Sequence, residues 1–536
     1  PVLNARLRKR WLAGALKVGV IGEAVDLTYS YEHLGAGPVA LAGLGKSKSD
    51  FVKGLKEAKS PAIIVGAGLG GLTTAALLAR AGRKVLVIEK SNSVGGAASS
   101  YKVGDLFVEG SLHETSDPHD PRDPKHDPLT RAGVLEAVKW IPSCTFYEVR
   151  GGPLGAPLTL PDNFDAARSA LIARFPEARE GIIRLLGEME QIASAVGVLS
   201  RGSSVFKSPA QAFSALRNML PAIRDWTLSL SQKLDRVFGD NEAVKAALAA
   251  NLSYYHDDPA TTWWVFFAAA QGSYLLSGGR YVQGGSQRLS SALARAIKTA
   301  GSEVILRRTA SIIAFDAQGR ITGLTHTAKD GSNPQTVNTS RIISNAAPET
   351  LASLLPEPSR TKLRAAYADR KPSISLFALT LGLSKPPREF GITGYSTQLL
   401  PNWMTGLDNY AQATGLMSDE PGSRMPPLAI VDYAAIESGI TTPPYVLSIV
   451  GPDRLSNWDG TDQDSYRAKR ARWQDAIVAY LDRSYPGLAQ SIVASTFNTA
   501  FSVQQYLGAP QGAVYGFAPT PPRSLFSTIK RTPATI

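Results

Sequence analysis

Cysteine is almost absent from this sequence, and histidine is rare. The chain has one cysteine, Cys144, which excludes an internal disulfide framework and any cysteine-rich metal site. We expect Cys144 to be a small packing residue. The six histidines are scattered without the spacing of metal ligands, so the sequence predicts no metal site.

Long apolar runs are also missing, and acidic residues are outnumbered. Lys17 and Glu23 interrupt the apolar N-terminal stretch, and no run reaches the ~18–20 residues that a membrane-spanning helix needs. Lysine and arginine total 57 against 45 acidic residues, and the net charge of +12 favours an anionic partner. No nucleic-acid motif accompanies this charge. The sequence therefore predicts no nucleic-acid partner and favours contact with a membrane surface.

The length predicts two domains. The 536 residues exceed the ~250–300 at which a single core stops growing, and 44% hydrophobic residues can fill the cores.

The segment 61–100 carries the clearest motif, PAIIVGAGLGGLTTAALLARAGRKVLVIEKSNSVGGAASS. Residues 62–65 are typical of a buried parallel strand, after which a glycine turn leads into a helix that ends near Arg80. Gly66 permits the tight turn and Gly68 lets a pyrophosphate approach the backbone. Gly71 lets the helix pack closely on the strand. The helix start then offers free N–H groups to phosphates.

A second strand, residues 84–88, ends in Glu89. This acid lies about 20 residues beyond the turn, where a carboxylate can accept the ribose hydroxyls of a dinucleotide and disfavours a 2′-phosphate. An isolated glycine motif would indicate little, but strand, helix, second strand and acid stand here in register.

The residues after Glu89 resemble a known family. The run GGAASS, which begins at Gly95, resembles the FAD-binding motif of the flavin amine oxidase and phytoene desaturase superfamily, and a fold that binds only NAD does not need it. The resemblance implies FAD as the cofactor. It implies these cofactor-binding residues: Gly66, Gly68, Gly70, Gly71, Glu89, Lys90, Gly95, Gly96 and Ala97, together with the backbone near Ala310.

The same resemblance implies an α/β fold in which a discontinuous Rossmann-like FAD-binding domain carries an inserted α+β substrate domain. Helices are expected over much of 129–251 and at 465–485, and a strand over 301–310. Aromatic helices at 254–276 are expected to line an apolar cavity. The implied domain borders are 61–112 and 280–350 for the FAD domain, 113–279 and 351–500 for the substrate domain, and 501–536 for the start of a last FAD segment that looks incomplete.

His113 and Glu114 follow the hairpin that returns beneath the cofactor in similar chains. They are candidates for polar groups that face the flavin or the substrate, and His113 could exchange a proton near neutral pH. The alternative for His113 is an ordinary hydrogen-bonding loop residue. The proline-punctuated segment 117–128 is expected to be a solvated loop.

Residues 1–60 form an N-terminal extension. Leu3, Leu7 and Trp11 share one helical face and basic residues lie between them, which suits an amphipathic helix in an anionic interface. The alternative is a helix that packs on the body of the protein.

The leading function is an FAD-dependent oxidoreductase of the phytoene desaturase, carotenoid isomerase and retinol saturase kind. It would desaturate, saturate or isomerise a hydrophobic polyene or isoprenoid in the cytoplasm, at a membrane surface. One alternative is a flavin amine oxidase, although Ala97 stands where those enzymes usually have arginine. The other is a non-catalytic flavoprotein.

Overall fold

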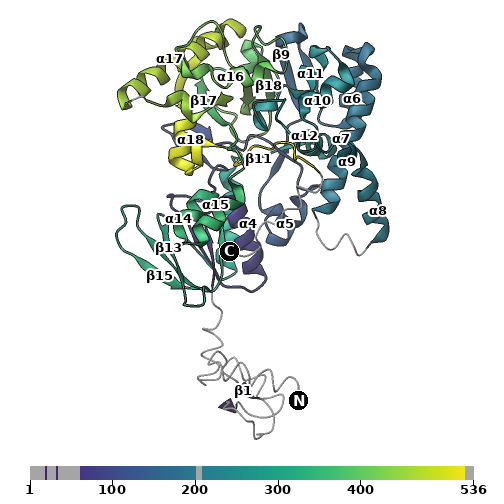
Figure 1. The fold of residues 1–536 in the computed structure, drawn as a ribbon. Coiled ribbons are helices and arrows are strands. Elements are labelled where there is room, and N and C mark those ends of the chain that lie inside the picture. Colours follow the sequence, from purple (N-terminus) through teal and green to yellow (C-terminus); the bar gives the residue numbers. More distant parts are fainter. Residues whose placement is uncertain (1–18, 21–31, 34–60, 201–207, 461, 525–536) are drawn as a thin grey trace.

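The computed structural model describes residues 19–20, 32–33, 61–200, 208–460 and 462–524. Figure 1 shows two bodies in this part of the chain. The lower body is built on a small parallel sheet and the upper body on a larger mixed sheet flanked by helices. This arrangement confirms the α/β fold with an inserted α+β region.

The parallel sheet has four strands in the order β12-β4-β3-β16. Its central strands follow the motif of segment 61–100, because β3 (Ala62–Val65) and β4 (Val85–Ile88) are apolar and almost wholly buried. Helix α4 (Leu69–Arg80) crosses between them, and α13 (Gln287–Thr299) packs beside it. The outer strands, β12 (Glu303–Ile305) and β16 (Ile342–Ser344), come from much later in the chain. Each outer strand therefore pairs with a central strand that lies more than two hundred positions earlier in the chain. This is the arrangement of a discontinuous domain.

A second, antiparallel sheet adjoins it in the order β13-β14-β15, with bounds Thr309–Phe315, Ile321–Thr327 and Gln335–Asn338. The strand expected over 301–310 is wrong as a single element. Arg307 has a positive φ of 58°, and this bend separates β12 in the parallel sheet from β13 in the antiparallel one. Helices α14 (Pro348–Leu354) and α15 (Ser359–Tyr367) follow.

The upper body contains a seven-stranded mixed sheet in the order β10-β9-β18-β19-β20-β17-β21. The two long strands, β17 and β20, pair antiparallel along nine residues each, whereas β9 and β18 run parallel. The bounds in sheet order are Leu158–Leu160, Tyr147–Gly151, Ser396–Leu400, Leu428–Asp432, Tyr445–Asp453, Ser375–Leu383 and Ile492–Asn498. Helix α17 (Gln463–Ser484) packs on this sheet through Trp473, Ile477 and Leu481.

Helices form the other side of the upper body (Figure 1). Helices are expected over much of 129–251, but between α5 (His126–Ala132) and residue 163 the chain forms β8 (Trp140–Pro142), β9 and β10. The expected α-helices follow after residue 163. Their bounds are Phe164–Arg174 for α6, Arg179–Leu199 for α7, Pro209–Asn218 for α8, Leu220–Arg224 for α9, Leu230–Phe238 for α10, Glu242–Ala249 for α11 and Trp264–Ser277 for α12.

A small sheet, β7-β11-β8, stands between the two bodies. Strand β11 (Gly279–Val282) pairs with β7 (Thr115–Ser116) on one side and with β8 on the other. The helix α5 (His126–Ala132) that lies between them in sequence packs on α4, and Leu129 and Trp140 belong to the same apolar core as α4. We therefore propose that the cofactor domain extends beyond residue 112 to about residue 142.

Two expectations have other outcomes. Cys144 is exposed rather than packed. The proposed amphipathic face at Leu3, Leu7 and Trp11 lies outside the described residues. The described residues before position 61 form the short parallel pair β1 (Gly19–Val20) and β2 (Glu32–His33). Among the described helices none is long and apolar enough to cross a membrane.

Candidate functional site

The turn between β3 and α4 has an open backbone edge. Gly66 has φ +95°, a conformation that residues with a Cβ atom rarely adopt. A Cβ atom added at Gly71 would lie 2.1 Å from the Gly66 carbonyl oxygen, so the close packing of α4 on the turn requires glycine. A Cβ atom at Gly68 would meet only the Asn345 side chain. No described side chain caps the first turn of α4, and its N–H groups can therefore serve a phosphate.

The second glycine pair lies directly beside this turn. Gly95 forms a parallel bridge with Gly68, and the Gly95 N–H donates to the Ala67 carbonyl at 2.8 Å. A Cβ atom at Gly96 would come within 3.2 Å of the Gly68 Cα atom. Gly96 and Ala97 are both exposed. The two glycine motifs, which β4 separates in sequence, thus form a single cradle.

Glu89 lies at the end of β4 beside the cradle. Its buried carboxylate accepts the N–H of Ala67 at 2.7 Å and that of Ser91 at 2.8 Å. A carboxylate offers about four lone-pair positions, so both oxygens can still accept a ribose hydroxyl. Lys90 is exposed next to it, and Ala310 pairs with His326 at the start of β13.

His113 is buried against aromatic residues of the upper body. Its Nδ1 shares a hydrogen bond of 2.5 Å with the Tyr433 hydroxyl, and the Tyr395 hydroxyl donates to its carbonyl. Burial lowers the pKa of His113 to about 4. The expectation that this ring exchanges a proton near neutral pH is therefore contradicted, because desolvation keeps the imidazole neutral there.

Glu114 lies next to β11 and is held by a hydroxyl. Ser143 Oγ donates to Glu114 Oε1 at 2.5 Å, and a Cβ atom at Gly279 would come within 1.8 Å of the same oxygen. Burial raises the pKa of Glu114 to about 8, and the negative charge of Asp162 adds to this effect, while the Ser143 hydrogen bond opposes it. Glu114 is therefore a protonated, neutral acid at pH 7.

A second acid, Glu109, is part of the same buried region, and no sequence pattern pointed to it. The hydroxyl of Tyr281 donates to Glu109 Oε2 at 3.0 Å, and the N–H of Ser286 donates to the same oxygen at 2.9 Å. Ser286 Oγ donates to the other oxygen. Tyr281 in turn lies against Tyr395 and Tyr433, with ring centroids 6.2 and 5.3 Å away. This tyrosine cluster joins Glu109 to His113.

The stability of the protein should fall as the pH rises because of Glu109. Burial raises its pKa from 4.5 to about 7, so the folded state binds a proton that the unfolded state releases between these values. The stabilisation is complete below about pH 4.5 and is lost as the pH rises through about 7, and a shift of this size corresponds to about 3 kcal/mol.

Chemical unfolding at about pH 5 and about pH 8 measures this loss. In Glu109→Gln the drop between the two pH values should shrink by up to about 3 kcal/mol, since an amide does not titrate, while Glu114 and Asp432, whose pKa values burial also raises, keep their own part of the drop. Glu437→Gln changes an exposed carboxylate and should leave the drop unchanged. An undiminished drop in Glu109→Gln would contradict the assignment.

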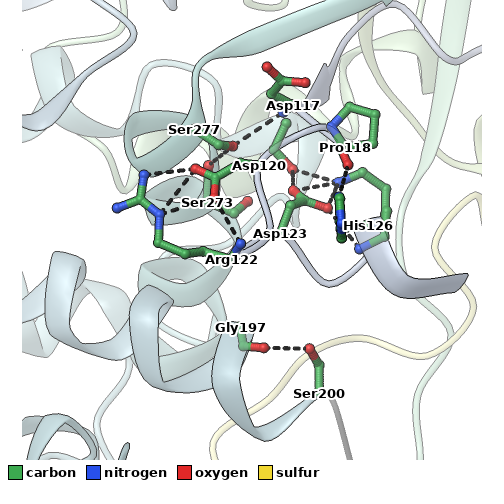
Figure 2. A network of polar contacts seen from close by, with 12 residues as sticks. Asp117, Pro118, Asp120, Arg122, Asp123, His126, Gly197, Ser200, Ser273 and Ser277 are labelled. Carbon is green, nitrogen blue, oxygen red and sulfur yellow. Dashed lines mark hydrogen bonds and ion pairs between the residues drawn. The ribbon is translucent and has the colours of Figure 1, made fainter. Parts of the chain in front are cut away.

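The segment 117–128 is an ordered clamp rather than a freely solvated loop (Figure 2). Three Asp-Pro-X repeats follow one another, and in each the aspartate Oδ1 accepts the N–H two residues later, at 2.8–2.9 Å. Arg122 binds the Asp120 carboxylate and the Leu276 carbonyl at the end of α12. No group of three ligand-type side chains that could hold a metal occurs among the described residues. The aspartates therefore fix the backbone between α12 and the cofactor domain.

Comparison with known proteins identifies the family. The model of the flavin containing amine oxidoreductases matches residues 69–474, which include α4, the second glycine pair, Glu114 and most of the upper body. The chain belongs to the flavin containing amine oxidoreductase family. It is an oxidoreductase with FAD as its cofactor, as the motif of segment 61–100 and its glycine pair predicted.

Individual relatives agree with this assignment. The chain is 23% identical to the all-trans-retinol 13,14-reductase of Rattus norvegicus over 486 residues, which cover 85% of this chain and 77% of the relative. The Homo sapiens reductase is 21% identical over 481 residues, with the same shares. This confirms the resemblance to retinol saturase.

Solved structures show the same fold at low identity. An oxidoreductase from Methanosarcina mazei has a TM-score of 0.54 and 16% identity, over 82% of this chain and 87% of that one. Cyclohexylamine oxidase from Brevibacterium oxydans has a TM-score of 0.52 and 16% identity, over 85% and 89%.

The N-terminal region has a different likeness. The model of the molybdopterin oxidoreductases matches residues 1–100. A stretch of 68 residues is 48% identical to the mitochondrial NADH-ubiquinone oxidoreductase 78 kDa subunit of Neurospora crassa, but it covers 13% of this chain and 9% of that protein. Since the chain spans so little of that relative, its activity is not carried over to this chain.

The described residues fit FAD. The open backbone at Gly68, the uncapped start of α4 and the exposed Gly70 leave room for phosphates, and the Glu89 carboxylate has lone pairs left for a ribose. The positive dipole end of α4 points to the same place. These groups are the ones that would hold the dinucleotide.

Proposed function

We propose that this flavoenzyme acts on a CH–CH group of a long apolar polyene or isoprenoid, of the retinoid or carotenoid kind, and that it reduces a double bond. Bound FAD, once reduced by an electron donor, would supply the hydride to carbon. The direction is favoured by Glu114, a buried carboxyl group that Ser143 holds and whose pKa burial raises to about 8. The two retinol reductases, which match 85% of this chain, support the substrate class.

Reduction of a carbon–carbon double bond needs one proton for each hydride, and Glu114 is the proposed source of that proton. The acid keeps its proton because burial disfavours the carboxylate. Ser143 fixes the carboxyl orientation through its hydrogen bond to Oε1. Tyr254 and Tyr274, whose pKa values burial raises, stay neutral nearby. Solvent would return the proton after each turnover.

His113 is the proposed positioning residue of this site. Its neutral ring holds the Tyr433 hydroxyl, and its carbonyl accepts that of Tyr395, so it fixes the tyrosine cluster beside Glu114. The same proposal includes contacts of FAD with the cradle and with Glu89, Lys90 and Ala310. It also includes the domain borders and contact with a membrane, which a substrate of this polarity would require for delivery.

Amine oxidation is the second candidate, since the family name and the cyclohexylamine oxidase fold both admit it. An amine substrate needs no proton donor at the reacting carbon, and a protonated Glu114 offers an ammonium group no opposite charge. The retinol reductases match the chain at higher identity than this solved amine oxidase, 21–23% against 16%. A polyene substrate is therefore better supported than an amine substrate.

The test is a spectral and product assay on the full chain with added FAD. All-trans-retinol is added anaerobically to the chemically reduced flavin, and a primary amine is added to the oxidised flavin in a separate sample. Reoxidation of the flavin bands by retinol, with a product that has gained H₂, is the expected result. Bleaching of oxidised flavin by the amine, with no change on retinol, would overturn the proposal in favour of amine oxidation.

A further inference from the structure

The helix pair α8–α9 carries a stripe of exposed apolar side chains. Phe213, Leu216, Leu220 and Ile223 are 70%, 61%, 58% and 39% exposed. Their steps of three, four and three residues place them on one face of a helix. Met219, which joins α8 to α9, has φ −81° and ψ −10°, so the backbone stays helical and the stripe is continuous.

The opposite face of the pair is tied to the protein body. Ala215, Pro221 and Ala222 are buried, and α8 and α9 both pack on α7. At the end of α9, Arg224 binds Glu188 and Asp225, which also hold the buried Lys233. The apolar stripe is therefore presented outward by a fixed helix, at the edge of the molecule (Figure 1).

The charge around this stripe has one sign. The sequence contains no aspartate or glutamate from Gln191 to Arg224. Arg217 is exposed one residue from Leu216, and no described carboxylate forms an ion pair with it. Arginine beside bulky apolar residues suits an anionic interface, where the stem lies in apolar material and the guanidinium reaches a phosphate.

We propose that α8–α9 is a docking surface for the anionic face of a lipid bilayer. The four apolar side chains enter the interface between headgroups and acyl chains, and Arg217 pairs with lipid phosphate or carboxylate. A protein partner is disfavoured because protein interfaces have a polar rim, whereas α8 and α9 contain no acidic residue and the carboxylates at the end of α9, Glu188 and Asp225, are buried against Arg224 and Lys233. The surface belongs to the layer that contains α7 and α12. It is a different segment of the chain from the N-terminal residues 1–60, for which membrane contact was also expected. The proposal does not depend on the identity of the substrate.

The test is flotation of the full chain with phosphatidylcholine vesicles, with and without phosphatidylserine. Wild-type protein should float with the anionic vesicles. Phe213→Ser/Leu220→Ser should bind at least about tenfold more weakly, and Arg217→Gln should lose much of the preference for phosphatidylserine. The matched control is Ile312→Ser/Val493→Ser, two apolar residues of similar exposure, 59% and 63%, on other elements, and it should float like wild type.

A fluorescent label locates the contact. In a Cys144→Ser background, an environment-sensitive dye on Leu216→Cys should shift to the blue with anionic vesicles, and the same dye on Val493→Cys should not. Equal flotation of the two double variants would overturn the proposal, as would an unshifted dye at residue 216 on floating protein. A change of oligomeric state in Phe213→Ser/Leu220→Ser without vesicles would also overturn it, because the stripe would then be a protein interface.

Discussion

Replacing Gly71 with alanine should remove FAD binding and destabilise the lower body. The added Cβ atom would stand 2.1 Å from the Gly66 carbonyl oxygen, and a backbone oxygen cannot rotate away. Relief requires α4 to move off the turn, which we expect to cost about 3 kcal/mol, the upper end of the range for overpacked sites. The same movement displaces the N–H groups that serve the phosphates, so FAD affinity should fall at least about a hundredfold.

Gly187, in the interior of α7, provides the matched control. A Cβ atom there would meet no atom within 4 Å. Alanine stabilises a helix interior by up to about 1 kcal/mol over glycine. Gly187→Ala lies outside the cradle, so it should retain FAD and melt at or slightly above the wild-type temperature. FAD titration and thermal unfolding of both variants measure the contrast, and equal behaviour of the two would sink the argument.

The cofactor cradle could be predicted because its chemistry is local. Strand, turn, helix and acid occupy a single segment of about forty residues, and each residue type has one physical reason to stand where it does. The sequence also located α17 from its helical pattern. It could not locate the break at Arg307, because a positive φ in an arginine leaves no mark in composition or periodicity.

The buried region that contains Glu109, His113 and Glu114 was predicted only in part. Glu114 and His113 were visible as polar residues after the hairpin, but their partners lie far away in sequence. Tyr433 is 320 residues from His113, and Tyr281 is 172 residues from Glu109. Tertiary packing alone brings these groups together. Tertiary packing also sets the pKa values of these groups. Burial lowers the pKa of His113 and raises that of Glu109, away from the values of isolated side chains.

Glu114→Gln should remove most of the reductase activity and change the shape of its pH profile. In the wild-type enzyme the acid loses its proton as the pH rises through about 8, so turnover should decline through that value. Glutamine keeps the shape and the approach to Ser143 but cannot donate an acidic proton. We therefore expect a loss of about 10²–10⁴ in turnover, typical of general acids, and a residual rate without the alkaline decline.

Ser143→Ala separates this role from a structural one. The Ser143 hydrogen bond stabilises the ionised form of Glu114, so its loss should raise the pKa further and move the alkaline decline to higher pH. Turnover at neutral pH should change little, because Glu114 is protonated in both enzymes. Anaerobic single-turnover reduction of all-trans-retinol across the pH range measures both variants, with the FAD spectrum as the check on folding. An alkaline decline that persists in Glu114→Gln, or one that stays in place in Ser143→Ala, would assign the proton to another group, and the tyrosine cluster with Glu109 would be the next candidate.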